Sequence, residues 1–126
     1  MTVLDASAVL ALVQDEPGAD LVAEVLDGAA MSTVNVAEVV GKLVDAGLDG
    51  RRAVELLESS GVEILSLTIE DAVLAGALRE LVGGRSLSLG DRCCLALGLR
   101  STPAEVLTAD RGWADLDLPL AVRLVR

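Results

Sequence analysis

Residues 2–13 read TVLDASAVLALV and contain the first strand and the first helix expected in the chain. Thr2–Leu4 has the composition of a short strand, and Asp5 ends it. Ala6–Val13 is almost entirely apolar and predicts a helix that is too short to be stable without packing against other elements. The chain therefore begins with a strand that leads directly into an apolar helix.

The same alternation of strand and helix continues along the chain. Further strands are predicted at Ala29–Met31, Val62–Leu67, Glu105–Leu107 and Ala121–Val125. Further helices are predicted from Asp15-Glu16-Pro17 to about Leu26, from a Ser32 or Thr33 cap to Ala46, at Arg51–Ser59, from a Thr68–Asp71 capping box to about Val82, and at Leu89–Leu99 before Pro103. This order favours right-handed crossovers and a parallel sheet covered on both faces. We expect one α/β domain over residues 1–126, with three layers (α/β/α) and a central parallel sheet of about four to five strands.

The composition sets limits on the core and on the location of the protein. Hydrophobic residues make up 52% of 126 residues, but Trp113 is the one aromatic residue, so the core has to be packed from Val, Leu and Ala. No apolar run is long enough for a membrane span, and Asp5 interrupts the N-terminal apolar stretch, which argues against a signal peptide. Cys93 and Cys94 are adjacent and have no other cysteine to pair with, which fits a reducing cytoplasm.

Acidic residues dominate the polar part of the sequence. The chain has no histidine and a formal net charge of −10, so histidine-based triads and imidazole metal sites are excluded. The charge also argues against a nucleic-acid binder held by surface charge, although it does not exclude a nuclease whose acidic site is neutralised by metal. The chemistry that remains near neutral pH is a carboxylate cluster, which points to Mg²⁺ or Mn²⁺.

Four carboxylates fall where strands or helices are expected to begin or end. Asp5 follows the first strand, Asp110 follows the fourth, Asp91 lies in the first turn of the sixth helix, and Glu38 lies on the second turn of the third. In a parallel sheet these places share the carboxyl edge, where sites form. Carboxylates gathered there repel each other by several kcal/mol at an effective dielectric near ~20, and a divalent cation would remove that repulsion.

Each acid also has an ordinary structural explanation. Asp5 could cap the first helix, and Asp91 could form a capping box with Ser88. Asp110 could cap the turn before Trp113. Glu38 and Lys42 have the spacing of a surface ion pair on a helix. These explanations would require four coincidences on one edge of one sheet.

The residues around the acids carry a family resemblance. The stretches are TVLDASA at 2–8, NVAEV at 35–39, LSLGDRCCLAL at 87–97 and LTADRGW at 107–113. In this order and spacing they resemble the PIN-domain ribonucleases, and most of all the VapC-type toxins of bacterial and archaeal toxin–antitoxin pairs. The resemblance covers essentially the whole chain, and it is the combination of the four stretches that is specific.

The resemblance implies an activity and a set of residue roles. It implies a cytoplasmic endoribonuclease that depends on Mg²⁺, or Mn²⁺, and is held silent by a cognate VapB-type antitoxin. By position it assigns Asp5, Asp91 and Asp110 to metal binding, with Glu38 and Asp110 completing the acidic, catalytic pocket. The low basic content departs from what an RNA-binding surface leads one to expect.

The resemblance also implies a supporting role for two further positions. Ser7 and Thr108 would support the pocket by hydrogen bonding. Ser7 also argues against a haloacid-dehalogenase-type phosphatase, which would have a second Asp two residues after the first. A phosphoacceptor receiver domain would need a lysine after its fifth strand, whereas Lys42, the one lysine, lies in a helix. A non-catalytic α/β interaction module remains as a further alternative.

The apolar excess predicts partners. The mean hydropathy is +0.56, which is high for a monomer. The third helix is apolar on more than one face, through Val34, Val36, Val39, Val40, Leu43 and Val44. One face should pack on the sheet, and we expect the other to form part of a homodimer interface or of an antitoxin groove.

Overall fold

The computed structural model describes residues 1–101 and 104–126, and these residues form a parallel sheet of five strands with helices on both sides. The strand order is β3-β2-β1-β4-β5, and each neighbouring pair is parallel. The strands are β1 (Thr2–Leu4), β2 (Ala30–Ser32), β3 (Glu63–Leu65), β4 (Glu105–Thr108) and β5 (Ala121–Leu124). The predicted parallel sheet and α/β class are confirmed.

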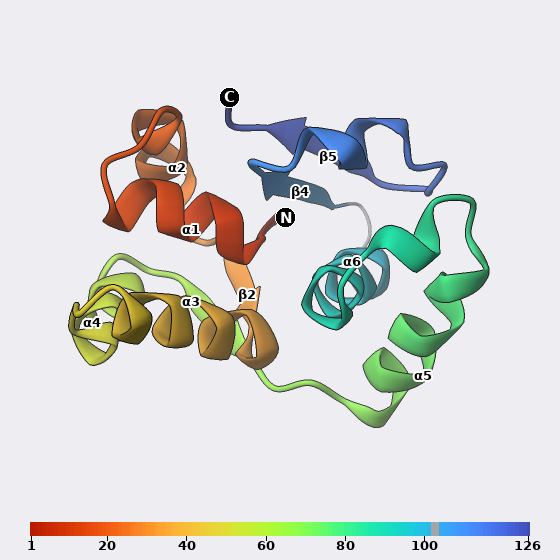
Figure 1. Ribbon diagram of the computed structural model, residues 1–126, viewed down its shortest axis with the longest axis horizontal. Helices are drawn as coiled ribbons and strands as arrows, with labels where there is room; N and C mark the ends of the chain where they lie inside the picture. The colour runs from red at the N-terminus through yellow and green to blue at the C-terminus, as the bar shows by residue number, and fades with distance from the viewer. Residues whose placement is uncertain (102–103) are drawn as a thin grey trace.

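Six α-helices and three short 3₁₀ helices occur in the described residues. The α-helices are α1 (Ala6–Val13), α2 (Ala19–Val25), α3 (Thr33–Asp45), α4 (Gly50–Ser59), α5 (Ile69–Ala77) and α6 (Leu89–Arg100). The 3₁₀ helices are η1 (Leu78–Glu80), η2 (Gly84–Ser86) and η3 (Arg111–Asp115). In Figure 1, α1 to α4 lie together on one side of the molecule, and α5 and α6 lie on the other. None of the described helices is long and apolar enough to cross a membrane.

Alternate strand residues face the two helical layers. Leu4 and Leu107 pack in the cluster that contains residues of α1 to α4. Val3 and Val106 pack in a second cluster with α6 and Trp113. Because successive side chains of a strand point to opposite faces, this division shows that the central strands are covered on both sides. Apart from Trp113, which is 1% exposed, the buried core is aliphatic or sulfur-containing, close to the predicted composition.

The helix caps explain where most helices begin. Ser32 accepts a hydrogen bond from Val34 N at 3.2 Å at the start of α3. Thr68 and Asp71 form the predicted capping box at the start of α5. These side chains satisfy backbone N–H groups that have no partner within the helix.

Two helix predictions are wrong at one end. The second helix begins at Ala19, not at Asp15-Glu16-Pro17, because Asp15 has a φ of 51° and Gly18 a φ of 97°, both outside the helical region. Gly18 also packs closely against Val125, where an added Cβ would lie 2.9 Å from the valine Cβ. This contact spans almost the whole chain, so local sequence could not predict it.

The fifth helix is shorter than predicted. Its α-helical part ends at Ala77, and Leu78–Glu80 continue as a 3₁₀ turn, instead of a helix to Val82. Leu78 is buried in the second core cluster, so the tighter turn places an apolar side chain in the core. The predicted end of the sixth helix before Pro103 concerns a residue outside the described part of the chain.

Candidate active site at the carboxyl edge of the sheet

The two central strands bring Asp5 and Thr108 together. Leu4 is paired with Leu107 in the parallel ladder between β1 and β4. Asp5 directly follows Leu4, and its backbone N donates to the Leu107 carbonyl at 2.9 Å. The residues after these paired positions therefore lie side by side at the carboxyl edge of the sheet, where the sequence predicted a site.

The Asp5 carboxylate is buried and held by two hydroxyl groups. Asp5 is 3% exposed, and its Oδ2 accepts hydrogen bonds from Ser7 Oγ at 2.6 Å and from Thr108 Oγ1 at 2.9 Å. Although Asp5 occupies the N-cap position of α1, its side chain makes no capping bond to that helix within the described residues. The contacts of Asp5 are thus those of a positioned carboxylate, and the supporting hydrogen bonds predicted for Ser7 and Thr108 are present.

The two hydroxyl groups are themselves fixed by the backbone after β4. Ser7 Oγ accepts from Ala109 N at 2.9 Å, and Thr108 Oγ1 accepts from Asp110 N at 3.0 Å. The backbone N–H groups of Ala109 and Asp110 therefore orient the two hydroxyls that donate to Asp5. This network ties the first and fourth acidic segments into one unit.

Glu38 is oriented by a buried asparagine. Asn35 is fully buried, and its Nδ2 donates to Glu38 Oε1 at 2.8 Å and to the Gly90 carbonyl at 3.1 Å. The Glu38 side chain thus lies against the start of α6, at Gly90, which immediately precedes Asp91. A Cβ added to Gly90 would overlap the Glu38 carboxylate, so any larger residue at position 90 would displace that carboxylate.

Asn35 and Gly90 had no role in the sequence prediction. Both lie within the stretches that carry the resemblance, at 35–39 and 87–97. The available signal was position: Asn35 precedes Glu38 by one helical turn, and Gly90 precedes Asp91. The contact between them joins α3 to α6 and could not be read from either segment alone.

Asp91 forms the capping box that was considered as its ordinary explanation. Its Oδ2 accepts from Ser88 N at 2.9 Å, and its backbone N donates to Ser88 Oγ at 3.1 Å. Oδ1 makes no hydrogen bond within the described residues, so the cap fixes the carboxylate and still leaves one oxygen for a ligand. A cap and a metal ligand are compatible roles for this residue.

The charges of three acids act on one another. Burial raises the pKa of Asp5, and the negative charge of Asp91 raises it further, against the lowering effect of the Ser7 and Thr108 hydroxyls. Burial also raises the pKa of Glu38, with smaller contributions from Asp5 and Asp91. Asp5, Glu38 and Asp91 therefore lie within one electrostatic neighbourhood, and ionising all of them is unfavourable without a cation.

Asp110 is linked to this group through its backbone. Its side chain is exposed, and Oδ1 accepts from Gly112 N at 2.9 Å, so it caps η3 as its ordinary explanation supposed. Its backbone is nevertheless joined to Thr108.

The Glu38–Lys42 surface pair is not formed. The ion pairs among the described residues do not include it, and Glu38 instead bonds Asn35 in the interior. The charge of Lys42 has the smallest of the effects on the pKa of Glu38. Glu38 is therefore turned towards the site and away from the helix surface.

The donor set suits a hard divalent cation. The converging groups are carboxylate and hydroxyl oxygens, whereas the thiols of Cys93 and Cys94 are buried, which raises their pKa values and keeps them protonated. The described residues contain no group of three acidic or thiol side chains close enough to form a complete protein cage. Mg²⁺ does not require such a cage, because it binds one or two carboxylates directly and keeps several waters.

Comparison with known proteins supports the fold. A model of the PIN domain family matches residues 2–118. Among solved structures, a toxin–antitoxin complex from Klebsiella pneumoniae has a TM-score of 0.77 at 20% identity, with 100% of this chain and 98% of that chain covered. VapBC2 from Rickettsia felis, bound to a promoter DNA fragment, has a TM-score of 0.71 at 15% identity, covering 98% and 97%. VapBC-5 from Mycobacterium tuberculosis has a TM-score of 0.57 at 24% identity, covering 99% and 97%. No curated protein gives a match.

Proposed function

Because this chain belongs to the PIN domain family, we propose that it is a Mg²⁺-dependent endoribonuclease that acts as the toxin of a toxin–antitoxin pair. Mn²⁺ would serve in place of Mg²⁺. The observation that carries the proposal is the buried Asp5 carboxylate, held by two hydroxyls and sharing its electrostatic neighbourhood with Glu38 and Asp91. An arrangement that holds like charges together in a folded protein is unfavourable unless a cation binds there.

The residues of the site divide into ligands and supports. Asp5, Asp91 and Asp110 would hold the cation, one or two of them directly and the rest through its bound waters. Glu38 would complete the acidic pocket and orient one of those waters. Bound Mg²⁺ supplies charge neutralisation for the phosphate oxygens and activation of water. The hydroxyls of Ser7 and Thr108 oppose the effect of burial on Asp5, because both lower its pKa.

Asn35 has a positioning role in this proposal. It holds one Glu38 oxygen at 2.8 Å and leaves the other free to face the site. Its own Oδ1 is buried and makes no hydrogen bond within the described residues. The side chain therefore has one acceptor to offer to a water in the site.

The proposed protein partner is a VapB-type antitoxin. The solved structures with the same fold include toxin–antitoxin complexes, which makes such a partner the natural expectation. A partly apolar hollow of about 350 Å³ lies between α1, α3 and α4, lined by Val13, Leu43, Leu48, Asp49, Arg52, Ala53 and Leu56. An amphipathic segment could bury its apolar face there.

The third helix needs fewer external contacts than its sequence predicted. Val39 and Leu43 are buried, and α4 covers a further side, with Gly50 packed closely against Val40. Val44 and Leu48 remain exposed, at 62% and 51%. We therefore restrict the proposed antitoxin or homodimer contact to this end of α3 and the turn into α4.

Expression in cells tests the proposed role. Induction of the wild-type chain should arrest growth and cause RNA cleavage, and co-expression with a small protein encoded by the adjacent reading frame should relieve both. The Asp5→Asn chain should be harmless, and Asp20→Asn, which changes an exposed acid on α2, should remain toxic. Continued normal growth on induction of soluble wild-type protein would instead favour a non-catalytic interaction module.

A further inference from the structure

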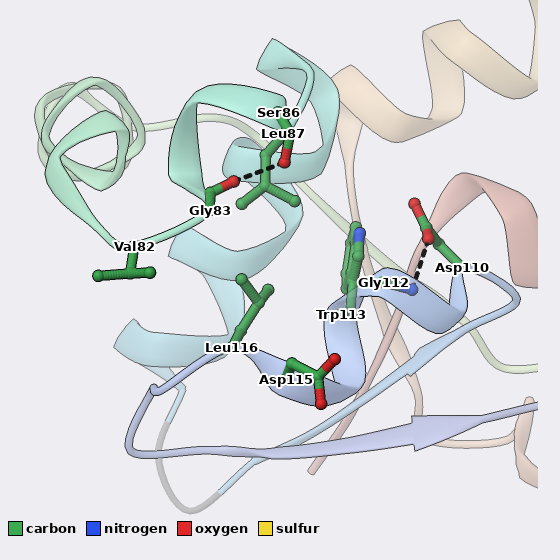
Figure 2. Close-up of a pocket in the computed structure, with 9 residues that line it drawn as sticks. All are labelled: Val82, Gly83, Ser86, Leu87, Asp110, Gly112, Trp113, Asp115 and Leu116. Carbon is green, nitrogen blue, oxygen red and sulfur yellow. Dashed lines mark hydrogen bonds between the residues drawn. The ribbon is translucent and has the colours of Figure 1, made fainter.

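A pocket of about 260 Å³ lies beside Asp110, outside the group formed by Asp5, Glu38 and Asp91. It is formed by the segment after α5 and by η3, and Figure 2 shows the side chains around it. Its apolar wall includes Leu87, Trp113 and Leu116, and its polar groups include Ser86, Asp110 and Asp115. The pocket therefore shares Asp110 with the proposed active site.

The indole of Trp113 carries an unpaired donor in this wall. The side chain is 1% exposed, and its buried Nε1 has no hydrogen-bond partner among the described residues. In Figure 2 the ring is seen edge-on, with its nitrogen at the end that lies towards Leu87 and Asp110 in that view. A buried indole N–H normally has an acceptor, and leaving it without one is unfavourable. The pocket is thus suited to a ligand that brings an acceptor atom to Trp113.

The carboxylates of the pocket require hydrogen-bond donors from the ligand. Asp115 is exposed at the rim, and Asp110 is already engaged through Oδ1 with Gly112 N. A carboxylate accepts hydrogen bonds only, so the ligand has to offer N–H donors on the side that faces Asp115. A ligand with its own negative charge in the pocket would be repelled by both acids.

A nucleobase meets these requirements, and guanine meets them best. A base is flat and largely apolar on its faces, which suits an aliphatic and aromatic wall. Guanine has adjacent N1–H and amino donors that can bind one carboxylate through two hydrogen bonds, together with O6 and N7 as acceptors for an indole N–H. Adenine and cytosine offer a single amino group, and uracil a single ring N–H.

We propose that this pocket binds a guanine base of the RNA next to the phosphate that the acidic site holds. Trp113 Nε1 donates to the base, and the Asp115 carboxylate accepts from it. The inference rests on the proposed ribonuclease function, and it predicts that the enzyme prefers to cut RNA next to a guanosine.

The single tryptophan makes the binding directly observable. In a ¹⁵N-labelled sample the indole N–H of Trp113 gives one resonance, which reports on the atom that the proposal concerns. The metal-free protein is titrated with the 5′-monophosphates of guanosine, adenosine, cytidine and uridine, and with ribose 5-phosphate. Guanosine monophosphate should move this resonance saturably and with the lowest Kd, whereas ribose 5-phosphate should leave it in place.

A matched pair of variants locates the contact. Asp115→Asn should weaken binding of guanosine monophosphate about tenfold, as expected for a hydrogen bond to a charged group. Asp117→Asn makes the same charge change two residues away, at an exposed position that does not line the pocket, and should have no effect. The proposal is overturned if ribose 5-phosphate moves the resonance as much as the nucleotides do, if no nucleotide moves it, or if the two variants behave alike.

The Asp5→Asn protein separates this proposal from the ribonuclease proposal. It should lose RNA cleavage and still bind guanosine monophosphate, because Asp5 does not line the pocket. Cleavage by wild-type protein without any nucleotide effect on Trp113 overturns the pocket assignment alone. Guanosine monophosphate binding without RNA cleavage supports the pocket and overturns the nuclease.

Discussion

Asp5 and Thr108 lie 103 positions apart in the chain, and a hydrogen bond of 2.9 Å joins the threonine hydroxyl to the aspartate carboxylate. The bond exists because β1 and β4 are adjacent and in register, so that the residues after Leu4 and Leu107 meet. It keeps a buried carboxylate closer to its ionised state than burial alone would allow.

Thr108→Val should therefore impair cleavage through the pKa of Asp5. The loss of one hydroxyl raises that pKa further, so the acid limb of the pH–rate profile should move to higher pH. The lost hydrogen bond to a charged group corresponds to about 1.5–3 kcal/mol. Thr2→Val, on β1 but outside the site, is the control. An unchanged pH–rate profile for Thr108→Val would contradict the proposed effect of Thr108 on the pKa of Asp5.

Gly90→Ala should abolish cleavage with little loss of secondary structure. The new methyl group would occupy the position of the Glu38 carboxylate and displace it from the site. Gly41→Ala, on the same helix as Glu38, meets nothing within 4 Å and should stabilise the protein by about 0.4–1 kcal/mol. Circular dichroism and thermal unfolding check the fold, and full activity of Gly90→Ala would contradict the placement of Glu38.

Glu38 and Lys42 should behave differently although they are one helical turn apart. Glu38→Gln should reduce cleavage by orders of magnitude, because it removes a charge from the site. Lys42→Ala should change stability by no more than about 0.5 kcal/mol and leave cleavage intact, as for an exposed residue that forms no ion pair among the described residues. The test is the RNA cleavage rate of each purified variant. Equal, mild effects of the two changes would show that Glu38 is an ordinary surface residue.

The metal-free protein should become less stable as pH rises through the raised pKa values of its buried acids. The pKa values of Asp5 and Glu38 are raised from 3.8 and 4.5, so the folded chain binds these protons more tightly than the unfolded chain does. Their contribution is present at acidic pH and lost as pH rises through the folded pKa values. Metal-free Asp5→Asn should consequently have a higher Tm than wild type at pH 7, and the difference should vanish below about pH 4.

The contribution of Asp71 to stability should change with pH in the opposite direction. Its hydrogen bonds with Arg100, at 2.7 and 3.0 Å, lower its pKa below 3.8. Its contribution to stability is therefore present above that value and lost as pH falls. Asp71→Asn should have a lower Tm than wild type at pH 7, and a shared direction for the two variants would refute this electrostatic account.

Much of the fold and the position of the acids followed from the sequence. The acids at 5 and 110 follow predicted strands, and the parallel order places both at one edge of the sheet. The family resemblance also pointed to Ser7 and Thr108, and the hydroxyls of both donate to Asp5.

Contacts between distant segments set the limit of prediction. The Asn35–Gly90 hydrogen bond depends on how α3 crosses α6, and the start of α2 depends on a contact with Val125. The sequence also left open whether Asp5 caps α1 or turns towards Thr108, since both are compatible with a residue between a strand and a helix. The pocket at Trp113 required segments from both sides of α6.

Metal-dependent RNA cleavage by the purified chain is the most direct test of the proposed function. Wild-type protein and Asp5→Asn, both shown to be folded, are incubated with single-stranded RNA in Mg²⁺, in excess EDTA, and in EDTA followed by an excess of Mg²⁺ or Mn²⁺. We predict cleavage by wild type with Mg²⁺, none in EDTA, recovery on adding either metal, and no cleavage by Asp5→Asn under any condition. Equal cleavage by both proteins, or undiminished wild-type cleavage in EDTA with contaminating nuclease excluded, would contradict the proposed function.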